Sequence, residues 1–286
     1  HCIYNRKLVN DGTINSIDDL AVFPNLRTLI LPCQQISDIS VLANLSALTE
    51  VDLSMNEIKS LEGINQLPNL YSLKVGNNPL TTLQGLEGLS GLSSLSIEGT
   101  QIHDLSILDA IKFTKRPSLN LNDIPCNDFS ALGSTEKFNR LSFSNTYYSL
   151  LLPYIDGKSI VRLEMNSAGL TSLDQLGTIT DLKELSVGDN NLTNLAGLQN
   201  LSQLKVIRLN WNQGISSLDG IEQLTELEEL SLEGCKEITD FSNLSTLNQL
   251  NWIQASREHR ESIEALKTNK WDVSYYPVIE DSGIEN

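Results

Sequence analysis

A repeat of 22 residues runs through almost the whole chain and constrains its fold more than any other feature. The clearest copy, residues 70–91, has the pattern L-x-x-L-x-V-x-x-N-x-L-x-x-L-x-x-L-x-x-L-x-x. The apolar residue that ends its L-x-V pair has an equivalent in every copy, at Leu31, Leu53, Val75, Ile97, Leu121, Phe143, Met165, Val187, Leu209, Leu232 and Ala255. Because one short repeat cannot enclose its own leucines, neighbouring copies must stack to remove them from water. We therefore expect one solenoid over residues 1–255, with about 11 full repeats and a partial one at the N-terminus.

The spacing within each copy predicts its local structure. Apolar residues that alternate with polar ones indicate a strand, and strands of successive copies can pair in parallel. The later leucines, three residues apart, suit 3-10 turns. The asparagine position (Asn56, Asn78, Asn190 and Asn212) can supply partners to backbone groups of adjacent turns. We expect irregularity in the copies that have another residue there, namely Thr100, Ile124, Thr146, Ala168 and Cys235.

This pattern resembles the leucine-rich repeat family, and its 22-residue form is similar to bacterial internalins and to SDS22-type regulatory subunits. The resemblance implies an α/β solenoid, a curved right-handed superhelix. Its parallel sheet would lie on the concave face, and 3-10 or other short turns would lie on the convex face.

The ends of the chain and its middle depart from the repeat. Residues 256–279 suggest a C-terminal cap, with a helix over 256–268 that Ser256 begins and a closing strand over 271–276. Residues 280–286 suggest a tail. Cys2 and Cys33 both lie near the N-terminal end, so a disulfide that caps this end is open. A lipid anchor on Cys2 is open as well, because Cys2 lies so close to the start. In the middle, we expect Tyr148 and Tyr154 to replace core leucines and Tyr147 to be exposed.

Composition limits the classes of partner. The net charge is −16 and the pI is about 4.5, so a nucleic acid partner is not expected. No apolar run approaches the 18 residues of a membrane span. The sequence shows no nucleophile motif, phosphate loop or metal cluster, so we expect neither an enzyme nor a cofactor. Cys126 and Cys235 occupy repeat positions that predict buried thiols.

Outward-pointing strand residues form the predicted binding surface. Protein-binding hot spots are enriched in Trp, Tyr and Arg, so the candidate residues are Arg140, Arg162, Arg208, Trp211 and Trp252. Charged residues of the central row support them, namely Asp52, Lys74 and Glu164. Trp252 has an alternative role, which is to support the C-terminal cap.

Three functions follow from these observations. The first is a monomeric bacterial module that binds a protein through its concave face. This module would be secreted or exposed on the cell surface, where a lipid anchor could hold it. The second is a cytoplasmic regulatory or scaffold subunit of the SDS22 kind. The third is the targeting part of a larger enzyme.

Overall fold

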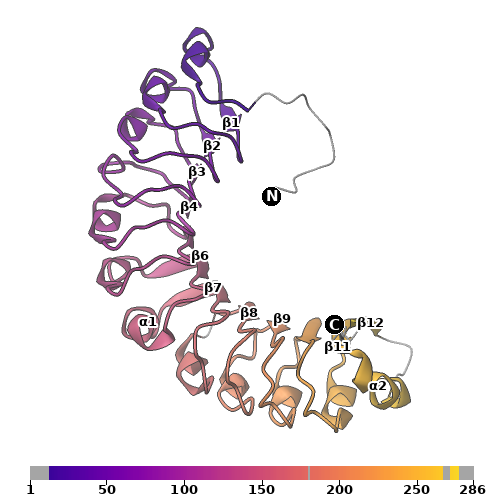
Figure 1. Cartoon of the computed structure of the whole chain (residues 1–286). Helices are drawn as coiled ribbons and strands as arrows, with labels where there is room; N and C mark the ends of the chain where they lie inside the picture. Colours follow the sequence, from indigo (N-terminus) through magenta and orange to yellow (C-terminus); the bar gives the residue numbers. More distant parts are fainter. Residues whose placement is uncertain (1–12, 180, 267–270, 277–286) are drawn as a thin grey trace, which may run out of the picture. The chain divides into compact units, whose positions relative to one another are not determined.

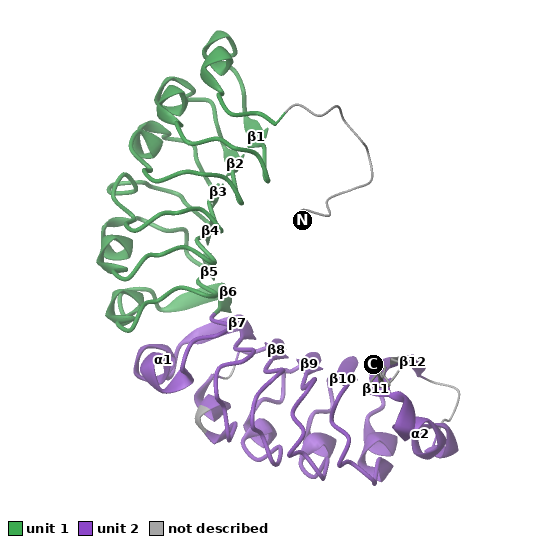
Figure 2. Ribbon diagram, viewed as in Figure 1, with its two compact units in different colours: residues 1–142 green, residues 143–286 purple. Residues whose placement is uncertain are grey.

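The computed structural model describes residues 13–179, 181–266 and 271–276. The chain divides into two compact units, residues 1–142 and 143–286 (Figure 2). Cys2 and the expected tail over 280–286 lie outside the described residues.

Strands that recur once per repeat form a parallel sheet in each unit. The strands of unit 1 are β1 (Thr28–Ile30), β2 (Glu50–Asp52), β3 (Ser72–Lys74), β4 (Ser94–Ser96), β5 (Ser118–Asn120) and β6 (Lys137–Ser142). The strands of unit 2 are β7 (Ser159–Glu164), β8 (Glu184–Ser186), β9 (Val206–Arg208), β10 (Glu229–Leu232), β11 (Trp252–Ser256) and β12 (Asp272–Tyr276). Within each unit every strand pairs in parallel with the next one along the chain.

Most of the connections between strands contain a short 3-10 helix. These helices are η2 (Ser40–Asn44), η3 (Ile64–Gln66), η4 (Ser106–Ala110), η5 (Ser130–Leu132), η6 (Asp174–Thr178), η7 (Leu198–Asn200), η8 (Ile221–Gln223), η9 (Ser242–Thr246) and η10 (Arg257–His259), and a further one, η1 (Asp18–Val22), precedes β1. In each unit the strands line the inner side of the curve and the 3-10 helices line the outer side (Figure 1). The leucines between these two layers are almost completely buried. The predicted fold class, a parallel sheet with short 3-10 turns on the opposite side, is therefore confirmed.

The repeated asparagine links adjacent copies through buried hydrogen bonds, as the sequence predicts. The Asn190 side-chain oxygen accepts hydrogen bonds from the backbone N–H groups of Ala168 and Leu170, at 2.9 and 3.0 Å. Its amide nitrogen donates to the carbonyls of Met165, Val187 and Gly188, at 2.9, 2.8 and 3.0 Å. Asn56, Asn78 and Asn212 likewise bond to backbone groups of their own and the preceding copy. One side chain thus satisfies polar groups that have no strand or helix partner.

The copies without asparagine make fewer of these bonds. The Thr100 hydroxyl donates only to the carbonyl of Ile97, at 2.7 Å, and the Cys235 thiol donates to the carbonyl of Leu209, at 3.2 Å. The Thr146 hydroxyl is buried without a hydrogen-bond partner in the described part of the chain. Cys126 and Cys235 are free and buried, as predicted.

An α-helix, α1 (Tyr148–Ile155), replaces the 3-10 segment in the first copy of unit 2, and this corrects the prediction for the tyrosines. Tyr148 and Tyr154 are only half-buried, while Leu151 and Ile155 fill the core. The reason is the change of period, because residues four apart share one face of an α-helix whereas the repeat places leucines three apart. Tyr147 is exposed, as predicted.

Beyond β11, η10 and α2 (Arg260–Leu266) lie within the range expected for the C-terminal helix, and β12 lies within that of the closing strand. Ile263 of α2 is fully buried. Ser256 takes the position before η10, but its side chain makes no capping bond. Instead its hydroxyl accepts a hydrogen bond from the Gly234 N–H at 2.8 Å, so the neighbouring copy uses the group that was expected to cap the helix.

His259 is buried in this C-terminal region, where its ring contacts Phe241 with 5.0 Å between ring centroids. Burial lowers the pKa of the imidazole below its ordinary value of 6.5, and the nearby Glu258 carboxylate opposes that shift. The folded protein therefore holds this ring neutral over a pH range in which the unfolded chain would protonate it.

Replacing Asn190 by alanine should lower the free energy of unfolding by about 2–4 kcal/mol, because several buried backbone groups lose their partners. Asn191→Ala is the matched control, since that side chain is exposed and only its backbone N–H bonds to Leu170. Urea denaturation measures both variants. Equal stabilities would contradict the role of the asparagine.

Acidification should destabilise the protein partly through His259. Above about pH 6.5 the ring is neutral in both states and contributes nothing. As the pH falls through that value, only the unfolded state gains the proton, so stability falls. The thermal midpoint of His259→Gln should therefore depend less on pH between 7.5 and 5 than that of the wild type. His103→Gln, at an exposed histidine, is the control and should retain the wild-type dependence.

Candidate functional site

The outward-pointing strand residues form rows along each unit, and we call this surface the sheet face. The strand pairings confirm the predicted register: Asp52 lies beside Lys74 in unit 1, and Glu229 lies beside Val206 and Trp252 in unit 2. Alternate strand residues, such as Leu73 and Leu185, point into the core. The sheet face is therefore the side on which one residue can change without disturbing the leucines.

Unit 1 contains three of the candidate residues, Asp52, Lys74 and Arg140. The Lys74 ammonium lies 3.4 Å from the Asp52 carboxylate. Lys74 and Arg140 both line a shallow hollow of about 500 Å³ on the sheet face. Ile30 and Met55 also line it, and they are 55% and 44% exposed. The hollow thus combines exposed apolar side chains with polar ones, and sequence reasoning did not select Ile30 or Met55.

Unit 2 contains the other five candidates. The arginines form ion pairs across neighbouring strands: Arg162 with Glu184 at 3.2 Å, and Arg208 with Glu229 at 3.7 Å. These pairs are partly exposed, so each contributes at most about 1 kcal/mol and can be exchanged for contacts with a partner. Glu164 lies in the central row beside Ser186. Trp252 is half-buried on β11, with Asp272 of β12 beside it.

One position after the strand has left-handed backbone geometry in successive copies, with φ between 53° and 60° in its non-glycine residues. Glycine, asparagine and aspartate tolerate this region, whereas other residue types rarely adopt it. Four copies nevertheless place Cys33, Met55, Ser167 or Trp211 there. Met55 and Trp211 are large, apolar and nearly half exposed. Their conformations cost about 1 kcal/mol each without burying the side chain fully, which is typical of a functional constraint.

Trp211 lies against the backbone of the next repeat. A Cβ atom added to Gly234 would come within 2.6 and 2.7 Å of the indole atoms Cε3 and Cδ2. The indole therefore covers the glycine closely, while 46% of the Trp211 surface remains open to solvent. The sequence does contain the signal for this arrangement, because Trp211 and Gly234 occupy the same position in consecutive copies.

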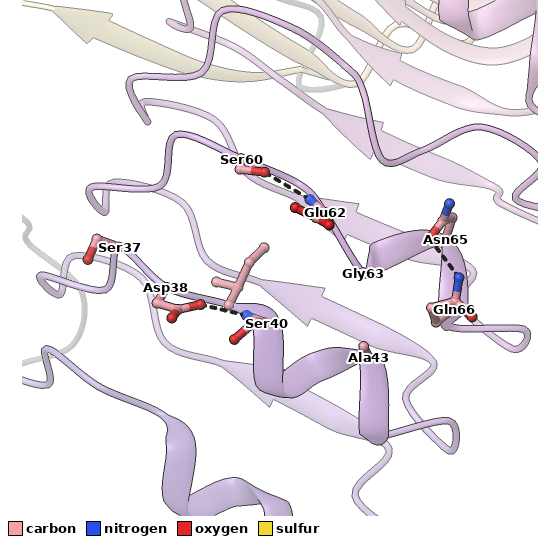
Figure 3. Close-up of a pocket in the computed structure, with 10 residues that line it drawn as sticks. Ser37, Asp38, Ser40, Ala43, Ser60, Glu62, Gly63, Asn65 and Gln66 are labelled. Carbon is pink, nitrogen blue, oxygen red and sulfur yellow. Dashed lines mark hydrogen bonds between the residues drawn. The ribbon is translucent and has the colours of Figure 1, made fainter.

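The outer side of unit 1 has a hollow of about 570 Å³ between η2 and η3 (Figure 3). At its edge the Asp38 carboxylate accepts a hydrogen bond from the Ser40 N–H at 2.8 Å, which lowers the pKa of Asp38. The same bond, with the same effect on the pKa, recurs at Asp104, Asp128 and Asp240. These bonds are part of the repeat and do not mark a specialised site.

No group of three or more His, Cys, Asp or Glu side chains in residues 13–179, 181–266 and 271–276 could hold a metal ion. None of the helices in these ranges has the length and apolar character needed to cross a membrane.

A family model described as "Leucine Rich repeats (2 copies)" matches residues 46–88 and 202–246. These two segments and the parallel sheet with its 3-10 turns show that the chain has a fold of the leucine-rich repeat kind. Its fold is similar to that of an internalin (inlF) from Listeria monocytogenes, with a TM-score of 0.62 and 22% identity over 92% of this chain and 84% of that one. The functional domain of InlJ from Listeria monocytogenes gives a TM-score of 0.50 and 17% identity, over 85% of this chain and 61% of that one. No curated protein sequence matches the chain.

Replacing Gly234 by alanine should destabilise the protein by about 1–3 kcal/mol, because the new Cβ meets the indole and the residue has a φ of 76°. In a Trp211→Asn background the contact with the ring is absent, so the same substitution should cost less. A double-mutant cycle by chemical denaturation measures the difference. Costs that are equal in both backgrounds would show that the indole does not lie on Gly234.

Proposed function

We propose that this chain is a non-catalytic module that binds a protein through its sheet face. The observation that carries the proposal is the conformation of Met55 and Trp211, two large apolar residues held outward at positions that favour small or polar ones. Solenoids of this kind present extended curved surfaces that are used for binding. The exposed ion pairs of Arg162 and Arg208 add polar groups that a partner can engage.

We further propose that the protein acts outside the cell or on a bacterial surface, as a monomer. Two observations support this location. Cys33 is disulfide-bonded, and disulfides persist mainly in oxidising compartments. The similarity of fold to internalins supports the same assignment.

The test is the capture of a protein partner from host or native extract by immobilised protein. Reversing the charges with Arg162→Glu and Arg208→Glu should weaken capture about tenfold, since the positive groups offered to the partner are then replaced by negative ones. Lys59→Glu is the control, because Lys59 is exposed and lines a hollow between repeats outside the strands.

Circular dichroism melts of all variants establish that they remain folded. The proposal is wrong if a partner still binds with wild-type affinity after serine replaces the central row of unit 2, that is Glu164, Arg208 and Gln254. It is equally wrong if Lys59→Glu abolishes capture while the sheet-face variants retain it.

A further inference from the structure

We propose that Trp211, Asp189 and Glu233 form a docking site for a cationic side chain, a lysine or arginine carried by a basic segment of the protein partner. This inference rests on the proposed protein-binding function and assigns a chemistry to one part of the sheet face. It depends on three features of unit 2: an exposed aromatic ring, a carboxylate on the copy at either side of it, and the ion pair that already occupies the nearest arginine.

The aromatic ring is the indole of Trp211. Gly234 supports one part of the ring, and nearly half of the residue is open to solvent. The main chain at Trp211 is held to the next copy, because the Trp211 N–H donates to the carbonyl of Glu233 at 2.6 Å. An exposed indole held in one place offers its π surface to a cation and loses little side-chain freedom on binding.

The carboxylates lie on the neighbouring repeats. Asp189 has the same position as Trp211 one copy earlier, and its N–H donates to the carbonyl of Asn210 at 2.7 Å. Copies are separated by the spacing of strands, about 4.8 Å, so Asp189 lies one strand spacing from Trp211, and its exposed carboxylate bonds to Ser167 of the copy before it. Glu233 belongs to the following copy, and its backbone contacts Trp211 directly.

Both carboxylates are hydrogen-bonded to neutral groups, so these bonds leave their negative charges uncompensated. The Ser167 hydroxyl donates to Asp189 at 2.7 Å, and the Gln254 amide donates to Glu233 at 2.7 Å. The nearest arginine of the central row, Arg208, instead pairs with Glu229. A cation over Trp211 would thus meet a π surface, with an uncompensated carboxylate on the copy at either side of it.

The charge of the whole chain favours the same occupant. A net charge of −16 attracts basic segments over long range and disfavours acidic ones. A lysine or arginine on a peptide segment can make a cation–π contact with the indole and is attracted by the carboxylates at the same time. The rest of the segment can extend along the sheet face.

The probes are synthetic peptides of a dozen residues that alternate serine with lysine, arginine or glutamine. Isothermal titration gives their affinities for the full chain, and the indole N–H signal of Trp211, assigned by Trp211→Phe, reports contact in NMR spectra. We expect the lysine and arginine peptides to bind and to shift that signal, and the glutamine peptide to do neither. Trp211→Ala should weaken binding at least threefold, the loss of a cation–π contact.

The charge contribution is tested by Asp189→Asn combined with Glu233→Gln, which should weaken binding by at least a similar factor. Glu226→Gln combined with Glu237→Gln removes the same charge at exposed positions outside the strands and should have little effect. Tyr147→Ala removes an exposed aromatic ring elsewhere and should also have little effect.

Two results would overturn the inference. One is that basic peptides bind the Trp211→Ala protein or the Asp189→Asn, Glu233→Gln protein as tightly as the wild type. Their binding would then come from the net negative charge of the chain and not from this site. The other is that no basic peptide shifts the Trp211 signal. Protein capture that still depends on the sheet face would then preserve the proposed function. Conversely, peptide binding together with capture that ignores the sheet face would overturn the proposed function alone.

Discussion

The burial of leucine between neighbouring repeats is the interaction on which the rest of this structure depends. A strand of three residues and a turn cannot shield apolar side chains on their own, so each copy is stable only against the next. The same constraint explains the buried asparagine. Stacking removes the turns from water, and their backbone groups then need partners that a side chain such as Asn190 supplies. The sheet face is the one surface of each strand that this packing leaves unrestricted.

Much of this fold could be predicted from the sequence because its two periods are so regular. The alternation in the strands and the 22-residue step placed Asp52 beside Lys74 and Glu229 beside Trp252, as the pairings show. The predictions that failed concern places where another local interaction prevails. Tyr148 lies in an α-helix whose period moves the core positions to Leu151 and Ile155. The hydroxyl of Ser256 bonds to Gly234 instead of capping a helix, which depends on a contact between copies.

The candidate site was predictable in its location but not in its details. The register identifies which residues point outward, and a preference for Trp and Arg selects Arg162, Arg208 and Trp211. The sequence does not reveal that Arg162 and Arg208 are already ion-paired, because ion pairing depends on the side-chain conformations of neighbouring strands. Nor does residue type alone select Met55, whose significance comes from its left-handed backbone. A comparison of this repeat position across all copies would have identified Met55 as an apolar residue where other copies have residues such as Asn77 and Asp189.

The contact between Trp211 and Gly234 also restricts how aromatic rings can be arranged on such a surface. An indole in the conformation of Trp211 needs a glycine at the same position of the next copy, so two consecutive copies cannot both carry a ring in that conformation. Aromatic anchors of this kind must therefore be at least two strand spacings apart, which is roughly 10 Å. That interval is about the length of three residues of extended chain. A ligand that used two such anchors would have to present its matching side chains at a repeat of at least that length, so the solenoid sets a minimum step for whatever it recognises.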